Sequence, residues 1–99
     1  MRINKKGLEC NIKTINCLLN TSDEPYTKHP EGVRANVGNY HLSMAYGGYA
    51  LHRMVNESGG AADVFNKGHM TARELSNLLH GFIAGIYLIQ SRGLYGSSN

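Results

Sequence analysis

Five histidines are the side chains of this sequence that could do acid–base or metal chemistry near neutral pH, and they are His29, His41, His52, His69 and His80. His41 and His52 are expected to lie as diagonal neighbours on one face of a β-hairpin, where two imidazoles could begin a metal site. No carboxylate or thiol lies close enough in sequence to complete it. The pattern predicts no metal site and favours histidines on a polar face or at an interface.

Ser43 is expected directly opposite His52 on the same hairpin, which places a nucleophile beside a base. A hydrolytic site also needs an orienting acid and an oxyanion hole, and neither can be assigned. The glycine pairs Gly47-Gly48 and Gly59-Gly60 lack the Gly-Lys-Ser/Thr that follows in a phosphate-binding loop. We therefore predict no catalytic residue and no cofactor, and we expect a protein that is not an enzyme.

Cys10 and Cys17 are the two cysteines of the chain. They have no disulfide framework around them and are expected to be small buried hydrophobes rather than a redox or metal pair. The first residues lack the apolar run of a signal peptide. The longest apolar stretch, Phe82 to Ile89, is too short to span a bilayer. The sequence predicts a cytoplasmic protein with reduced thiols and no membrane partner.

A β-hairpin from Tyr40 to Asn56 is the first element that must position these side chains. Gly47-Gly48 separates two strand-like runs, and the tight turns of hairpins favour glycine because they require positive φ. A turn at these two residues predicts the pairs Tyr46 with Tyr49, Met44 with Leu51, Leu42 with Arg53, and Tyr40 with Val55. These eight side chains share one face, which is apolar apart from Arg53.

A long C-terminal amphipathic helix, from about residue 71 to 91, is the second element. Thr71-Ala72-Arg73-Glu74 fits a capping box, and Gly93 is expected to stop the helix. The apolar stripe that follows the cap is Leu75, Leu78, Leu79, Phe82, Ile83 and Ile86. The expected core is this stripe packed on the hairpin face that carries Tyr40, Leu42, Met44, Leu51 and Val55.

Gly81 and Gly85 occupy one side of this helix, and each glycine costs about 1 kcal/mol relative to alanine in a helix interior. Small residues four apart allow another backbone to approach closely. The two alternatives are close packing against the N-terminal segment and a helix-to-helix homodimer. Tyr87 adds apolar surface to the same half of the helix, which supports the homodimer.

The remaining segments complete a single domain, residues 1–99, of α+β class. In residues 8–20 Leu8, Ile12, Ile15 and Leu19 recur at helical spacing, but weak helix formers and alternating apolar residues favour a strand that extends the sheet. Residues 21–39 contain both prolines and no periodicity, so we expect a long loop. Residues 57–60 are expected to turn, residues 61–65 to form a short strand, and residues 93–99 to fray.

Composition bounds the partners. Ten Lys and Arg against seven Asp and Glu give the 99-residue chain a net charge of +3, which disfavours a DNA mimic and permits nucleic-acid contact. Tyr and Arg most often anchor protein interfaces. The expected partner-binding residues are Tyr26, Lys28, Arg34, Tyr46, Tyr49 and Arg53. A nucleic-acid-binding regulator would instead use Arg2, Lys5, Lys6, Lys13 and Arg53, and a nucleotide-sequestering protein would use Tyr46, Tyr49 and Arg53.

Residues 38–88 resemble a class of small proteins encoded by phages and prophages. The matching pieces are Ala45-Tyr46-Gly47-Gly48, Asn56 with Gly59-Gly60 and Asp63, Thr71-Ala72-Arg73-Glu74-Leu75, and Gly85-Ile86-Tyr87-Leu88. The resemblance implies an accessory protein of a mobile element that acts in the cytoplasm of a host cell. Such proteins often antagonise host defence, for instance as CRISPR inhibitors, so the resemblance implies a host protein or complex as partner.

Overall fold

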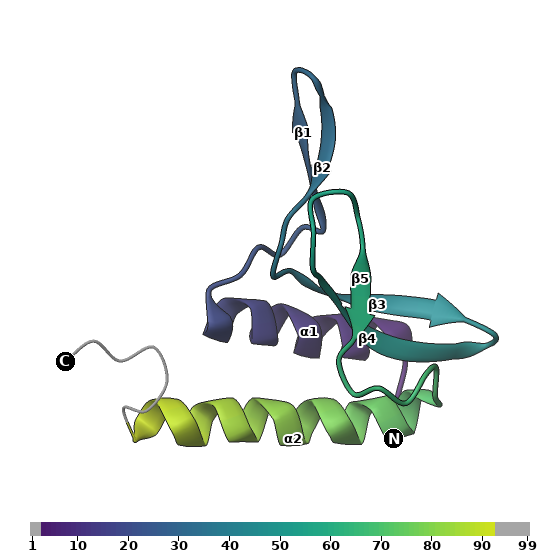
Figure 1. Ribbon diagram of the computed structural model, residues 1–99. Helices are drawn as coiled ribbons and strands as arrows, with labels where there is room; N and C mark the ends of the chain where they lie inside the picture. Colours follow the sequence, from purple (N-terminus) through teal and green to yellow (C-terminus); the bar gives the residue numbers. More distant parts are fainter. Residues whose placement is uncertain (1–2, 93–99) are drawn as a thin grey trace.

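The structure is a computed structural model, and it describes residues 3–92 of the chain. Two helices and five strands follow one another as α1 (Lys5–Leu19), β1 (Tyr26–His29), β2 (Gly32–Ala35), β3 (Tyr40–Ala45), β4 (Gly48–Met54), β5 (Ala61–Asp63) and α2 (Ala72–Ser91). The strands form a two-stranded antiparallel sheet and a three-stranded antiparallel sheet of order β3-β4-β5. The expected α+β class is confirmed (Figure 1). The tail at 93–99 lies outside the described residues.

Helix α1 occupies the segment that we expected to be a strand, so that prediction is wrong. Asn4 caps the helix by accepting a hydrogen bond from the Gly7 N–H at 2.9 Å. Leu8, Ile12 and Ile15 are buried on one side of it. Their spacing of four and three matches the helical period, and the burial of this stripe outweighs the weak helix propensity of the residues between them.

Helix α2 begins and ends close to the expected bounds. The Thr71 side chain accepts from the Glu74 N–H at 3.1 Å, and the Glu74 carboxylate accepts from the Thr71 N–H at 3.0 Å. These two bonds are the predicted capping box. Leu75, Leu79 and Ile86 are buried, whereas Leu78 is only partly buried.

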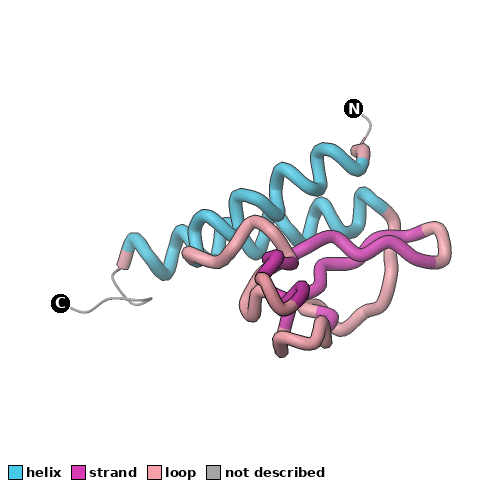
Figure 2. Tube along the Cα trace, turned by 90° about the horizontal axis from the view of Figure 1, so that it is seen from above, coloured by secondary structure: helices cyan, strands magenta, loops and turns pink. Residues whose placement is uncertain are grey.

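The two helices lie side by side and run in the same direction (Figures 1 and 2). The Asn11 side chain lies 3.4 Å from His80 Nε2 in the middle of the pair. Near the C-terminal ends of the two helices, the Gln90 side chain donates to the Leu18 carbonyl oxygen at 2.8 Å. The first and the last element of the fold are therefore direct neighbours, and every strand lies between them in sequence.

The segment that we expected to be a long loop contains the β1–β2 hairpin, so the loop prediction is wrong for residues 26–35. His29 pairs with Gly32 across a Pro30-Glu31 turn. Pro at the second position and Gly at the fourth are the ordinary signature of a tight turn. Figure 1 shows this hairpin rising away from the helices, and at its base the Ala35 N–H donates to the Glu57 carbonyl at 3.0 Å.

The β3–β4 hairpin turns one residue earlier than expected. Ala45 pairs with Gly48, so the turn residues are Tyr46 and Gly47, with φ of 55° and 73°. The predicted cross-strand pairs are wrong, and the observed pairs include Met44 with Tyr49, Leu42 with Leu51, and Tyr40 with Arg53. The pairing shifts by two residues, and side chains alternate with a period of two, so the residues assigned to each face stay the same.

The helices cover the face of the sheet that we expected to be internal. Leu51 is fully buried in one cluster with Leu8, Leu75 and Leu79, and Leu42 is partly buried against it. Met44 and Val55 are 53% and 44% exposed, so their assignment to the core is wrong. β5 follows the expected 57–60 turn and pairs with the end of β4. The helices thus cover one face of the sheet, and on the opposite face the β4 residues Ala50 and Met54 are also buried.

Candidate binding surface on the β3–β4 hairpin

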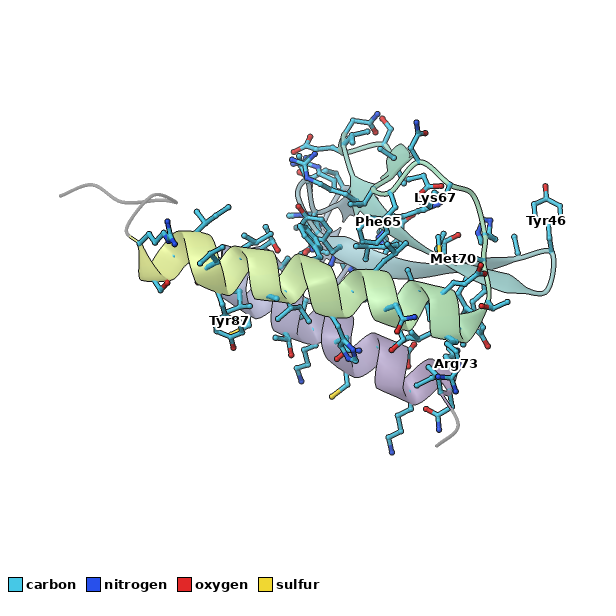
Figure 3. The ribbon with its side chains drawn as sticks, turned by 90° about the horizontal axis from the view of Figure 1, so that it is seen from below. Tyr46, Phe65, Lys67, Met70, Arg73 and Tyr87 are labelled. Carbon is cyan, nitrogen blue, oxygen red and sulfur yellow. The ribbon has the colours of Figure 1, made fainter. Side chains whose placement is uncertain are left out.

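Tyr46 stands at the free end of the β3–β4 hairpin. Its side chain is 99% exposed, and its backbone adopts the left-handed conformation with φ of 55°. This conformation is unfavourable for a residue with a Cβ, and hairpin turns of this kind prefer Asn, Asp or Gly. Its ring centroid lies 6.0 Å from that of His69. Figure 3 shows the ring projecting beyond the rest of the hairpin.

Three imidazoles form a row on the sheet face opposite the helices. The ring centroids of His41 and His52 are 5.9 Å apart, and those of His52 and His69 are 5.8 Å apart. His69 Nε2 lies 2.9 Å from Ser43 Oγ, within hydrogen-bond distance. The expected Ser43–His52 pair is wrong, because Ser43 faces Ala50 and His52 faces His41.

His69 is the member of this row that sequence reasoning missed. It lies outside the hairpin and reaches Ser43 because the next residue, Met70, is bonded to β4. The Tyr49 N–H donates to the Met70 carbonyl and the Met70 N–H donates to the Tyr49 carbonyl, both at 2.8 Å. No local spacing in the sequence signals a contact across 26 residues.

Burial lowers the pKa of His41, and the neighbouring His52 lowers it further. His41 Nδ1 also lies 3.0 Å from Asn39 Oδ1. The imidazole of His41 therefore binds a proton less readily than an ordinary histidine. Within residues 3–92, no three His, Cys, Asp or Glu side chains are grouped so that they could hold a metal ion.

A groove of about 440 Å³ opens between α1, the segment before β1, and β3. Its residues are Glu9, Ile12, Lys13, Asn16, Asp23, Glu24, Pro25, Tyr40, His41 and Leu42. One of these residues, Asn16, is 2% exposed, and both polar atoms of its side chain are hydrogen-bonded. Its amide donates to the Tyr40 carbonyl and its oxygen accepts from the Tyr40 N–H, both at 2.9 Å. The groove combines an apolar interior with three carboxylates and one ammonium group.

The six expected partner-binding residues fall on two separate hairpins. Tyr26 and Lys28 share one side of β1, and Arg34 in β2 lies 3.7 Å from Glu31. Tyr46 is at the end of the β3–β4 hairpin. Tyr49 packs against the core, whereas Arg53 is exposed and faces Tyr40. Within one chain Tyr46, Tyr49 and Arg53 thus lie at separate places along the β3–β4 hairpin, and nucleotide binding by these residues stays a prediction.

Gly81 and Gly85 have no neighbour on their open side in residues 3–92, since a Cβ added at either position would meet nothing within 4 Å. Close packing of the described N-terminal segment against them is therefore not found. Tyr87 is 55% exposed on the same helix. The homodimer through this surface stays a prediction.

The cysteines are exposed, so their expected burial is wrong. Both lie on α1, on the side that faces away from Leu8 and Ile15. The prediction failed because it assumed the alternation of a strand, which would have turned both cysteines inward. The basic residues weighed for nucleic-acid binding are also divided, with Lys5, Lys6 and Lys13 on α1 and Arg53 on β4. Arg2 lies outside the described residues.

Neither helix of the described part of the chain combines the length and the apolar character needed to cross a membrane. Comparison of the chain with models of protein families, with curated proteins and with solved structures finds no match.

Proposed function

We propose that this chain is a small accessory protein of phage or mobile-element origin that binds and inhibits a host protein. The target is a host defence complex, for instance a CRISPR–Cas assembly. The observation that carries the proposal is Tyr46, a fully exposed aromatic ring at the end of a hairpin, in a backbone conformation that tyrosine disfavours. Local strain of this kind is concentrated at functional sites.

An exposed tyrosine of this type suits an interface anchor. Tyrosine supplies a large contact area with few rotatable bonds, so little conformational entropy is lost when it is buried by a partner. The His69 ring lies beside it, with the two ring centroids 6.0 Å apart. Met44, which is 53% exposed on the adjoining strand, adds apolar surface next to the anchor.

Capture of host protein from bacterial lysate tests the proposal. The full chain carrying an affinity tag is compared with Tyr46→Asn, because asparagine fits the left-handed turn and removes only the ring. The matched control is Tyr87→Gln, which removes a half-exposed tyrosine from α2 instead. We expect one host protein or complex to be retained by the wild-type chain and by Tyr87→Gln, and to be lost with Tyr46→Asn.

An activity measurement separates inhibition from mere binding. In a host with an active CRISPR–Cas system, expression of the wild-type chain should raise the transformation efficiency of a targeted plasmid, and Tyr46→Asn should not. Recovery of no host protein at native salt, or equal capture by Tyr46→Asn, would refute the proposed role of this residue.

A further inference from the structure

The outer edge of β3 carries backbone groups that are not used inside the molecule. Tyr49 bonds through both its N–H and its carbonyl to Met70, so these groups point away from β3. Met44, the cross-strand partner of Tyr49, must then point its own N–H and carbonyl away from β4. The same holds for Leu42, because its partner Leu51 accepts from the Val64 N–H on the far side. These four groups have no hydrogen-bond partner within residues 3–92.

At Tyr40, which lies on the same edge of β3, a side chain satisfies the outward backbone groups. Tyr40 also points its N–H and carbonyl outward, and the Asn16 side chain bonds both at 2.9 Å. The amide of Asn16 therefore takes the place of a neighbouring strand at Tyr40. The edge remains open from Leu42 to Met44 and is closed by α1 beyond that point.

The other sheet edges are blunted in ways that proteins commonly use against unwanted pairing. β5 has only three residues. β1 and β2 have four residues each, and they carry Lys28, Arg34 and the Pro30 turn. β3 has six residues, and its open part presents the apolar side chains of Leu42 and Met44.

The groove beside this edge contains more acidic than basic side chains. Leu42 lines the groove, and so do the carboxylates of Glu9, Asp23 and Glu24. None of these carboxylates forms an ion pair within the described residues, and the groove holds a single ammonium group, that of Lys13. A protein with a net charge of +3 thus has a locally acidic groove at the Leu42 end of its open edge.

We propose that the open edge of β3 binds an extended segment of the partner protein, which adds as a further strand and places a Lys or Arg side chain in the acidic groove. The proposal deepens the proposed function, since it assumes that the chain binds a protein. Backbone bonds to Leu42 and Met44 would supply part of the affinity, and the groove would supply the preference for a basic residue.

Selection from random nine-residue peptides displayed on phage tests this proposal with the full chain as bait. We expect enriched peptides to carry Lys or Arg among alternating apolar residues. The most enriched peptide is then synthesised, and its dissociation constant is measured against variants of the edge. An absence of enrichment, or enrichment of peptides that lack basic residues, would overturn the proposal.

Met44→Pro removes one outward N–H without breaking the β3–β4 ladder, because proline is tolerated where the N–H of an edge strand faces solvent. Binding of the peptide should weaken by about three- to tenfold, as expected for the loss of one backbone hydrogen bond. Met44→Thr keeps the N–H and is the matched control, with affinity close to that of the wild type. Glu9→Gln combined with Glu24→Gln should weaken binding and reduce its dependence on salt. Equal affinity of Met44→Pro and Met44→Thr would contradict the proposal.

Amide hydrogen exchange gives a measurement that does not depend on a variant. In the free chain the amides of Leu42 and Met44 should exchange rapidly, whereas those of His41 and Ser43 should be protected by β4. The peptide should protect Leu42 and Met44, and a lack of protection would overturn the proposal even if Met44→Pro failed to fold.

Two further outcomes separate this proposal from its alternatives. If native mass measurement shows a dimer that Met44→Pro converts to a monomer, the edge is occupied by a second copy and the proposal is wrong. If host protein is captured by the wild-type chain and equally by Met44→Pro, the proposed function stands and only the edge proposal falls.

Discussion

Replacing Asn16 by alanine should destabilise the fold more than its single amide suggests. Asn16 is 2% exposed, and its oxygen accepts from both the Tyr40 N–H and the Thr21 hydroxyl, the latter at 2.7 Å. Its amide donates to the Tyr40 carbonyl. Alanine would leave two backbone groups of Tyr40 without partners, at a cost of about 1–3 kcal/mol each where water is excluded. Because the groove admits some water, we expect a loss of about 3 kcal/mol in the free energy of unfolding.

Urea denaturation followed by circular dichroism measures this loss. A loss of about 3 kcal/mol is a large part of the roughly 5–15 kcal/mol that stabilises a small domain, so the midpoint should fall clearly. The matched control is Asn11→Ala, which brings the same gain in helix propensity and removes only the 3.4 Å contact with His80. We expect this control to change stability by less than about 1 kcal/mol. If Asn16→Ala also cost less than about 1 kcal/mol with an unchanged m-value, Asn16 would not be holding the edge of β3.

Three further predictions concern the turn, the histidine row and the thiols. Tyr46→Asn should raise the free energy of unfolding by about 0.5–1 kcal/mol, because asparagine accepts the left-handed turn and a ring that is 99% exposed contributes little to packing. Thermal unfolding would measure this gain, and destabilisation would mean that the ring is packed. The pKa of His41 is lowered in the folded state, so when the pH falls below the ordinary value of about 6.5 the unfolded chain binds more protons and the free energy of unfolding decreases. In urea titrations His41→Gln should lose less stability than the wild type between pH 7.5 and pH 5, and equal losses would contradict the lowered pKa. Cys10 and Cys17 should react with Ellman's reagent in the native state at rates close to those in urea, and the oxidised monomer should contain no internal disulfide, because positions seven apart on a helix are separated by about 10 Å.

The elements with strong local signals could be predicted from the sequence. The capping box at Thr71 and the stripe after it give α2, and the glycines at 47 and 48 give a hairpin. The predicted position of the turn was wrong. We placed both glycines in the turn because glycine favours positive φ, whereas in the structure Tyr46 takes the left-handed conformation and Gly48 belongs to β4. The face assignments survived this error only because the pairing shifted by an even number of residues.

The N-terminal half was predicted less well, for two physical reasons. In α1 the stripe of Leu8, Ile12 and Ile15 competes with weak helix propensity, and only burial against α2 decides the outcome. In the β1–β2 hairpin nearly every side chain is exposed, so no alternation of apolar and polar residues marks the strands.

The candidate site combined predictable and unpredictable parts. Tyr46 was identified from residue type and its place near the turn. His69 and the Asn16–Tyr40 bonds were not, because each joins residues that are 24 or more positions apart in the sequence. Contacts of that kind depend on the tertiary arrangement and leave no periodic trace in the chain.

The neighbouring, co-directional helices have a consequence for how the chain acquires its structure during synthesis. The core cluster joins Leu8, Ile12 and Ile15 to Leu75, Leu79 and Ile86, so the partners of α1 leave the ribosome only after every strand has been made. Fragments that stop before α2 would expose the apolar stripe of α1 and the sheet face that α2 covers. We expect the nascent chain to depend on late, long-range closure, and to fold more slowly than a helical protein of equal size whose contacts are local.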